Sequence, residues 1–245
     1  MVTAVFPAAG QGRRMNVGIN KVFLDLLGKP ILVHTLQRFS RSKNIHHLVV
    51  VVAAEEVSFI RKLLKAVPGL KPYQVVAGGT ERQYSIANGL AVVPKESEII
   101  LVHDAARPLT SIETIDRVVA GAREVGGAIA AVPEKNTVKV VDEDGIVRET
   151  PPRKTLWEVQ TPQGFRREIL LEAYRKAEED GFLGTDDSSL VERLGVPVKV
   201  VESDYRNIKV TTPEDMLIAE AFLQKQRLKR TKDAAKKVLG KIFPQ

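Results

Sequence analysis

The sequence predicts an α/β fold, with a mostly parallel, twisted sheet, helices on both of its faces, and a protruding β-hairpin arm. Two observations carry this prediction. Short runs rich in Val and Ile alternate with amphipathic segments along most of the chain, which is typical of strands that are covered on both faces by their connecting helices. The alternation breaks at about 134–156, where two short β-type segments flank the turn sequence DEDG, and this pattern favours a hairpin.

The individual elements follow from apolar spacing and from the residues at their ends. We expect strands at 2–6, 47–53, 72–77, 98–103, 128–133 and 198–203. We expect helices at 30–40, 55–67, 82–93, 111–125, 167–179 and 186–194, and a further strand followed by a last helix within 207–223. Thr110 and Glu113 have the spacing of a capping box, and Thr212 before Pro213 has the pattern of an N-cap.

Composition limits the class of protein. The chain has 245 residues, of which 44% are hydrophobic, enough to build the core of one large α/β domain. It contains no cysteine, which excludes disulfides and fits a reducing compartment. The N-terminus lacks the pattern of a secretory signal, and the longest apolar run, 48–54, is far shorter than the roughly 20 residues of a membrane span. We therefore expect a cytoplasmic protein without a membrane partner.

The positive charge is concentrated at one end. Residues 224–245 contain eight Lys or Arg and one Asp and so carry the whole net charge of +7. We divide the chain into a domain at 1–223 and a basic, helical tail at 224–245. Because the body is neutral, the high pI does not indicate that the body binds nucleic acid. A non-catalytic protein that binds nucleic acid or another anion through its tail is the alternative from a different functional class.

A glycine-rich loop follows the first strand. The stretch PAAGQGRRMNVGINK at 7–21 lacks the third glycine of a dinucleotide fingerprint and the GK[ST] of a Walker A loop. Its small residues, Ala8, Ala9, Gly10 and Gly12, allow a base or phosphate to approach the main chain. Arg14 and Lys21 supply cations for a polyphosphate, which suits the charge that develops during nucleotidyl transfer.

Two more loops follow strands and end at the same edge of the predicted sheet, where ligands bind in this class of fold. GGTERQYS at 78–85 leads from a strand into a helix, and HDAARP at 103–108 ends another strand. Asp104 has two candidate roles, contacting ribose hydroxyls or holding a hydrated Mg²⁺. Arg107 either faces phosphate or pairs with Asp104. His103 is expected to be a packed residue at the strand end.

Seven motifs in this order resemble the 2-C-methyl-D-erythritol 4-phosphate cytidylyltransferases of non-mevalonate isoprenoid synthesis. They are PAAGQGRRM with Lys21, GGTERQYS, HDAARP, NTVK (136–139), TPQGF (161–165), TDD (185–187) and NIKVTTPED (207–215). The resemblance implies a Rossmann-like nucleotidyltransferase fold. It also implies a reaction in which methylerythritol 4-phosphate attacks the α-phosphorus of the co-substrate CTP in line, with Mg²⁺, and pyrophosphate leaves.

The resemblance also assigns roles to individual residues. It places Arg14 and Lys21 around the α-phosphate, and Arg153 and Lys209 where they position the sugar phosphate. The residues implied for the nucleotide are Ala8, Ala9, Gly10, Gly12, Gly79, Thr80, Arg82, Ser85, Asp104 and Ala105, with Asp104 also the candidate for Mg²⁺ through water. Those implied for the acceptor, besides Arg153 and Lys209, are Arg107, Thr137 and Thr185. A homodimer formed through the arm would bring Thr137 and Arg153 to the neighbouring subunit.

Two positions depart from the family pattern, and related enzymes remain as alternatives. Asn20 stands where proline is usual before Lys21, and Asn136 replaces the usual Asp at the entrance of the arm. A ribitol 5-phosphate cytidylyltransferase has similar loops, although the second alanine of HDAARP, Ala106, favours methylerythritol phosphate. A sugar-1-phosphate nucleotidyltransferase would have a longer signature loop and a different acceptor half.

Overall fold

The computed structural model describes residues 1–10 and 20–242 and confirms the α/β prediction. The strands of the main sheet lie in the order β3-β2-β1-β4-β8-β5-β9. Their bounds are Val2–Pro7 (β1), His47–Val52 (β2), Tyr73–Ala77 (β3), Ile99–Val102 (β4), Gly127–Pro133 (β5), Trp157–Arg166 (β8) and Val198–Glu202 (β9). Strands β1 to β4 are parallel to one another, and β5 is parallel to β9.

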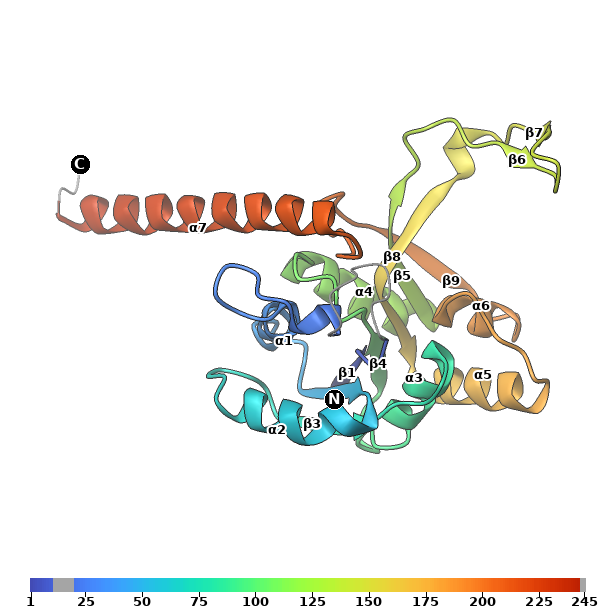
Figure 1. The fold of residues 1–245 in the computed structure, drawn as a ribbon, viewed down its shortest axis with the longest axis horizontal. Helices are drawn as coiled ribbons and strands as arrows, with labels where there is room; N and C mark the ends of the chain where they lie inside the picture. Colours follow the sequence, from blue (N-terminus) through green and yellow to red (C-terminus); the bar gives the residue numbers. More distant parts are fainter. Residues whose placement is uncertain (11–19, 243–245) are drawn as a thin grey trace.

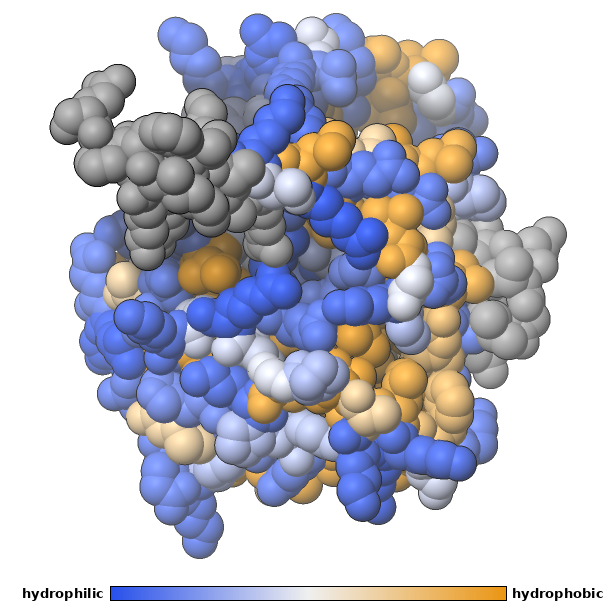
Figure 2. Space-filling model, turned by 90° about the vertical axis from the view of Figure 1, so that its left-hand side faces the viewer, coloured by the Kyte–Doolittle hydropathy of each residue, from blue (hydrophilic) through white to orange (hydrophobic). Residues whose placement is uncertain are grey.

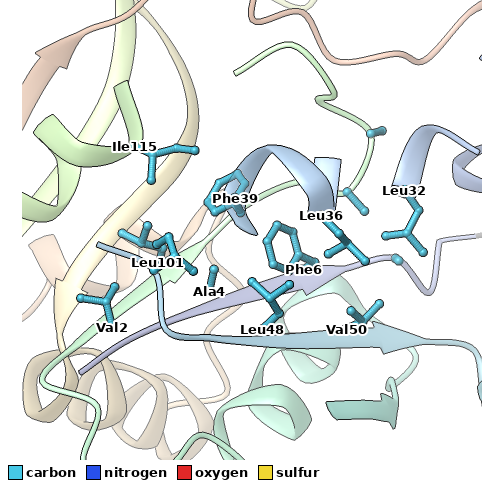
Figure 3. Packing of buried hydrophobic residues seen from close by; sticks show 14 of the residues in the cluster. Val2, Ala4, Phe6, Leu32, Leu36, Phe39, Leu48, Val50, Leu101 and Ile115 are labelled. Carbon is cyan, nitrogen blue, oxygen red and sulfur yellow. The ribbon is translucent and has the colours of Figure 1, made fainter. Parts of the chain in front are cut away.

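Helices cover both faces of this sheet (Figure 1). They are α1 (Ile31–Ser40), α2 (Val57–Lys65), α3 (Arg82–Leu90), α4 (Ile112–Val125), α5 (Arg167–Glu179), α6 (Asp187–Glu192) and α7 (Pro213–Ile242). On one face, Phe6 of β1 points toward Leu36 and Phe39 of α1 (Figure 3), and α2 and α4 extend the same apolar layer. On the other face, Val5 packs against the layer formed with α3, α5 and α6. Successive residues of β1 thus point into the cores on opposite faces of the sheet, as expected for a strand that is covered on both faces.

Strand β8 was not predicted. It runs antiparallel between β4 and β5, with Leu101 opposite Gly164 and Ala128 on the other side of the same glycine. A Cβ on Gly164 would lie 2.5 Å from Cδ2 of Leu101 and 2.9 Å from Cγ1 of Val118, so any larger residue here would displace buried side chains on the neighbouring elements. The sequence WEVQTPQGFR mixes polar residues, Pro and Gly, and a strand with this composition has no hydrophobic periodicity that would reveal it.

The strand expected at the start of NIKVTTPED is absent, and one helix start is corrected. Residues 207–210 have no regular secondary structure, and Val210 N–H donates to the carbonyl of Ala106 in a loop. Thr212 does cap α7, since its hydroxyl accepts from Asp215 N–H at 3.3 Å. The capping box at Thr110 is wrong, because Ser111 is the N-cap of α4 and accepts from Thr114 N–H.

Helix α7 begins on the body and then projects away from it (Figure 1). Its first turns bury Ala219 and Leu223 against Leu26, Ile31, Leu109 and Val210. Farther along, Arg227 donates to the carbonyl of Leu27 at 3.0 Å. Figure 2, which views the molecule from the end toward which α7 points, shows a surface on which hydrophilic side chains predominate. No helix in the described part of the chain is both long and apolar enough to cross a bilayer.

The predicted arm is present as an antiparallel pair, β6 (Val140–Val141) and β7 (Val147–Glu149). It stands away from the main sheet, between the end of β5 and the beginning of β8 (Figure 1). Its base is fixed to the body by Tyr205, whose hydroxyl donates to the carbonyl of Pro133 at 2.6 Å while Lys135 lies over its ring. The arm's apolar side chains are about half exposed in the single chain.

Candidate active site

A cleft of about 390 Å³ opens where β1 and β4 end, and its walls come from five separate segments. These segments are the end of β1, the start of the short helix at Lys21–Phe23, the turn before α3, the loop after β4, and the stretch that precedes α7. The predicted residues that line it are Ala8, Ala9, Gly10, Lys21, Gly79, Thr80, Arg82, Ser85, Asp104, Ala105 and Lys209. Motifs from the whole length of the chain therefore meet at one place, as the carboxyl ends of parallel strands require.

Asp104 lies at the centre of a cluster of three cations. Its carboxylate is 2.9 Å from Lys209 Nζ, 3.5 Å from Arg107 Nε and 3.7 Å from Arg82 Nε. Burial disfavours the charged carboxylate, but the attraction of these three groups prevails and holds the pKa of Asp104 well below its usual range. The residue is therefore ionised at neutral pH, and it fixes Arg82 and Lys209 on the wall of the cleft.

Arg82 has a second partner that was not predicted as a site residue. Its guanidinium lies 2.8 Å from Asp187, which is fully buried at the start of α6 and also accepts a 2.5 Å hydrogen bond from the hydroxyl of Tyr174. Arg82 thus bridges Asp104 and Asp187 and cannot rotate freely. The planar guanidinium suits such a bridge, since it offers several donors in a fixed geometry. The TDD motif contains Asp187, but sequence spacing alone does not show which arginine it serves.

The turn before α3 is shaped by close packing. A Cβ on Gly78 would lie 2.7 Å from Ser85 Oγ, and one on Gly79 would lie 2.7 Å from Cβ of Tyr84, so larger residues do not fit at either position. The hydroxyl of Ser85 accepts from Gly79 N–H at 3.1 Å. Ser85 therefore holds the turn that forms this wall of the cleft.

Asn20, the departure from the family pattern, attaches the Lys21 segment to the end of β1. Its side-chain amide donates to the carbonyl of Ala8 at 2.6 Å, and its side-chain oxygen accepts from Val22 N–H at 3.3 Å. Asn20 is also the N-cap of the short helix that begins at Lys21. Hydrogen bonds thus locate the backbone of Lys21 without the fixed φ angle of a proline.

His103 is a packed strand-end residue, as expected. It is fully buried beside Phe6 and Phe39. Asp104 N–H donates to Thr161 Oγ1, so the hydroxyl proton of Thr161 is directed at His103 Nδ1, 2.9 Å away. The proton of the imidazole is therefore on Nε2, which faces the carbonyl of Arg107 at 3.2 Å. Burial lowers the pKa of His103 to about 3, and a neutral ring of fixed tautomer supports the Asp104 loop.

The lowered pKa of His103 makes the stability of the folded protein depend on pH. Between pH 6.5 and 3 the unfolded chain binds a proton at His103 that the folded chain excludes, so stability is lost as the pH falls below 6.5. We expect His103 to contribute a loss of about 2 kcal/mol in the free energy of unfolding between pH 7 and pH 5. Urea titrations of the wild type and His103→Gln at both pH values measure this difference. An equal pH dependence in the two proteins would contradict it.

Several predicted residues lie outside the cleft, and two lie outside the described residues. Thr137 and Arg153 are exposed on the arm, and Arg153 donates to the carbonyl of Lys135 at 2.9 Å. Thr185 is exposed in the loop before α6. Arg107 lies behind Asp104 and donates to the carbonyl of Asn207 at 2.7 Å. Gly12 and Arg14 fall within 11–19, beyond the described part of the chain.

The described residues contain no group of three His, Cys, Asp or Glu side chains arranged to hold a metal ion. Two carboxylates line the cleft, the buried Asp104 and the exposed Glu81. Such a lining fits Mg²⁺, which keeps several waters and is commonly held by one or two carboxylates together with substrate phosphates. It does not fit a metal that needs a complete cage of protein ligands.

Comparison with known proteins agrees with this geometry. The family model for IspD, 2-C-methyl-D-erythritol 4-phosphate cytidylyltransferase, matches residues 2–225. Proteins of that name from Caldanaerobacter subterraneus and Geobacter metallireducens are 48% and 49% identical to this chain. These two alignments cover 91% and 92% of this chain and 99% and 98% of the relatives.

Solved structures show the same relationship. The 4-diphosphocytidyl-2C-methyl-D-erythritol synthase of Anaerococcus prevotii superposes with a TM-score of 0.82 at 34% identity, covering 91% of this chain and 96% of that one. The 2-C-methyl-D-erythritol 4-phosphate cytidylyltransferase of Thermus thermophilus gives a TM-score of 0.72 at 31% identity, covering 91% and 98%. The chain therefore belongs to the 2-C-methyl-D-erythritol 4-phosphate cytidylyltransferase family.

Proposed function

We propose that the cleft transfers a cytidylyl group from CTP to 2-C-methyl-D-erythritol 4-phosphate and releases pyrophosphate. The observation that carries the proposal is the cluster in which Asp104 holds Arg82 and Lys209 at the rim of a cleft lined by small residues. Small residues let the nucleotide approach the main chain, and fixed cations stabilise the charge that develops on phosphoryl oxygens. This is the chemistry that the family name describes.

In this proposal the enzyme acts by alignment and electrostatics and forms no covalent intermediate. Lys21 and Arg14 neutralise charge around the α-phosphate as the acceptor phosphate attacks in line. Ala8, Ala9, Gly79, Thr80 and Ser85 form the cytidine pocket, in which main-chain groups distinguish the cytosine edge. Lys209 orients the phosphate of the acceptor. Two polyanions repel each other in water, so holding them in the reactive geometry supplies a large part of the rate enhancement.

Magnesium, a dimer and a cytoplasmic location complete the proposal. Mg²⁺ bound to the triphosphate, with Asp104 in reach through water, would lower the charge on the leaving pyrophosphate. The exposed apolar residues of the arm support pairing with a second copy, which would carry Thr137 and Arg153 to the neighbouring cleft. The absence of cysteine fits a reducing compartment in which CTP is available.

The test is pyrophosphate release from CTP and Mg²⁺, run in parallel with methylerythritol 4-phosphate and ribitol 5-phosphate. We expect release with the first acceptor. Release with ribitol 5-phosphate alone would move the protein to the sister activity. No release with either acceptor, from folded protein, would overturn the proposed function and leave binding of anions by the basic tail as the alternative to examine.

The arm gives a second prediction, which separates the two substrates. Arg153→Ala should raise the KM for the acceptor by at least about tenfold, because a charge-assisted hydrogen bond to phosphate contributes about 1.5–3 kcal/mol. The KM for CTP should change by less than about twofold, since the cytidine pocket lies in the cleft and not on the arm. Arg148→Ala, which removes another exposed arginine from the same arm, is the matched control. Weaker CTP binding by Arg153→Ala would remove this residue from the acceptor site.

A further inference from the structure

The segment between β9 and α7, which carries Lys209 to the cleft, forms no strand. It connects β9 to α7, and residues 207–210 have no regular secondary structure. Its backbone is tied to the cleft where Val210 N–H donates to the carbonyl of Ala106 at 2.8 Å. A loop of this kind is ordered only when side chains compensate for the missing ladder of hydrogen bonds.

Asn207 provides that compensation. Its side chain is 1% exposed, and its oxygen accepts from the hydroxyl of Thr110 at 2.6 Å. Its amide nitrogen donates to Gln160 Oε1 at 2.8 Å and to the carbonyl of Thr161 at 2.9 Å. Its own carbonyl accepts from Arg107 at 2.7 Å. Both amide protons and the amide oxygen are therefore used, and a buried network that is fully satisfied selects one arrangement.

The hydrogen-bond partners of Asn207 lie on the same two segments that support Asp104. Thr110 and Arg107 belong to the loop between β4 and α4, while Gln160 and Thr161 belong to β8. Thr161 is also the residue whose hydroxyl accepts from Asp104 N–H. Asn207 thus joins the loop that holds Asp104 to the segment that holds Lys209, and the two charged groups meet at 2.9 Å.

We propose that Asn207 is a positioning residue that sets the place of Lys209 relative to Asp104 without touching either substrate. The inference rests on the proposed function, in which Lys209 orients the acceptor phosphate. A lysine side chain is long and flexible, so its ammonium is placed accurately only if its backbone is fixed. A displacement of about 1 Å can cost about a hundredfold in rate. The proposed cytidine pocket at residues 8–9 and 79–85 lies on other segments, so the binding of the cytosine base is expected to be spared.

Two variants remove hydrogen bonds of the Asn207 side chain, and one matched control removes a buried threonine hydroxyl elsewhere in the protein. Asn207→Ala removes every bond of the side chain, and Thr110→Val removes the hydroxyl that donates to Asn207. Thr3→Val is the control, because Thr3 is fully buried and its hydroxyl bonds Ser97 Oγ at 2.7 Å where β1 and β4 begin, at the end of these strands opposite to the cleft. Thr110→Ser retains the hydroxyl and serves as the rescue.

We expect kcat/KM for the acceptor to fall by about 30- to 100-fold in Asn207→Ala and by about tenfold in Thr110→Val. The KM for CTP should stay within about threefold of the wild type. Thr3→Val should lower the Tm by several degrees, as Thr110→Val does, with turnover unchanged. Thr110→Ser should recover most of the lost kcat/KM. Two results would overturn the inference. One is a loss of kcat/KM for the acceptor no larger than that of Thr3→Val, and the other is a rise in the KM for CTP as large as the loss of kcat/KM for the acceptor.

Amide hydrogen exchange of residues 204–212, measured on the same proteins without substrates, separates this inference from the proposed function. Asn207→Ala should accelerate exchange at Val210 N–H far more than Thr3→Val does, whether or not the wild type turns over. If the wild type releases pyrophosphate but exchange is unchanged in Asn207→Ala, the positioning role is wrong and the function stands. If the wild type is inactive while exchange responds as expected, the function fails and the structural role of Asn207 stands.

Discussion

Asp104→Asn should lower kcat/KM by at least a hundredfold, which corresponds to about 2.7 kcal/mol of lost transition-state stabilisation. The carboxylate balances Lys209, Arg82 and Arg107, and a neutral amide would leave three cations to repel one another. The change should also reduce the free energy of unfolding by about 3–5 kcal/mol, since Arg107 would keep a buried charge without its partner. Steady-state kinetics and urea titration measure the two effects.

The matched control for this experiment is Asp180→Asn. Asp180 also pairs with an arginine, Arg193 at 2.8 Å, but both partners are exposed and neither lines the cleft. Exposed pairs contribute about 0–1 kcal/mol, so this variant should remain close to the wild type in both stability and turnover. If Asp104→Asn kept its activity within about fivefold, the carboxylate would not be the group that arranges the cations of the cleft.

Lys21→Ala should reduce kcat by about 10²- to 10³-fold while the KM for CTP changes by less than about threefold. Lys21 lines the cleft at the start of a helix whose N-cap is fixed to β1 through Asn20. A cation held in this way stabilises the charge that develops at the α-phosphate more than the charge already present in bound CTP. The split between kcat and KM is therefore the quantity to measure.

Lys29→Ala is a suitable control for Lys21→Ala. Lys29 lies eight residues later in the same segment, and its ammonium donates to Gln37 Oε1 at the surface. Removing it changes the net charge equally but leaves the cleft intact. A loss in Lys21→Ala that appeared only as a higher KM for CTP would assign Lys21 to uniform binding instead of transition-state stabilisation.

The fold was predictable where local pattern and tertiary environment agree. Runs such as HLVVVV are buried on both faces, so their composition reveals them. Strand β8 was missed because its place between β4 and β5 depends on shape, above all on the missing side chain of Gly164, and not on apolar periodicity. NIKV has the composition of a strand, yet the loop after β4 takes its backbone hydrogen bonds, because Arg107 donates to the carbonyl of Asn207 and Val210 N–H donates to the carbonyl of Ala106.

The site was predictable to the extent that its residues lie in recognisable motifs at strand ends. Its supporting residues were not. Asp187 and Asn207 stand in motifs that were noticed, but their roles depend on partners about 100 residues away, Arg82 for the first and Thr110 for the second. Such pairings are set by the packing of whole elements, and a single sequence contains no signal for them.

Helix α7 has a consequence for the electrostatics of the whole molecule. At about 1.5 Å per residue, the last basic residues of the tail lie roughly 20 Å beyond Arg227, the point where α7 still contacts the body. The Debye length at physiological ionic strength is about 8 Å. The field of these last basic residues is therefore largely screened before it reaches the body, and the pI of about 9.5 reflects charge that lies mainly on the tail. A change in the last turns of α7 would leave the charges at the cleft, on which attraction of CTP depends, as they are.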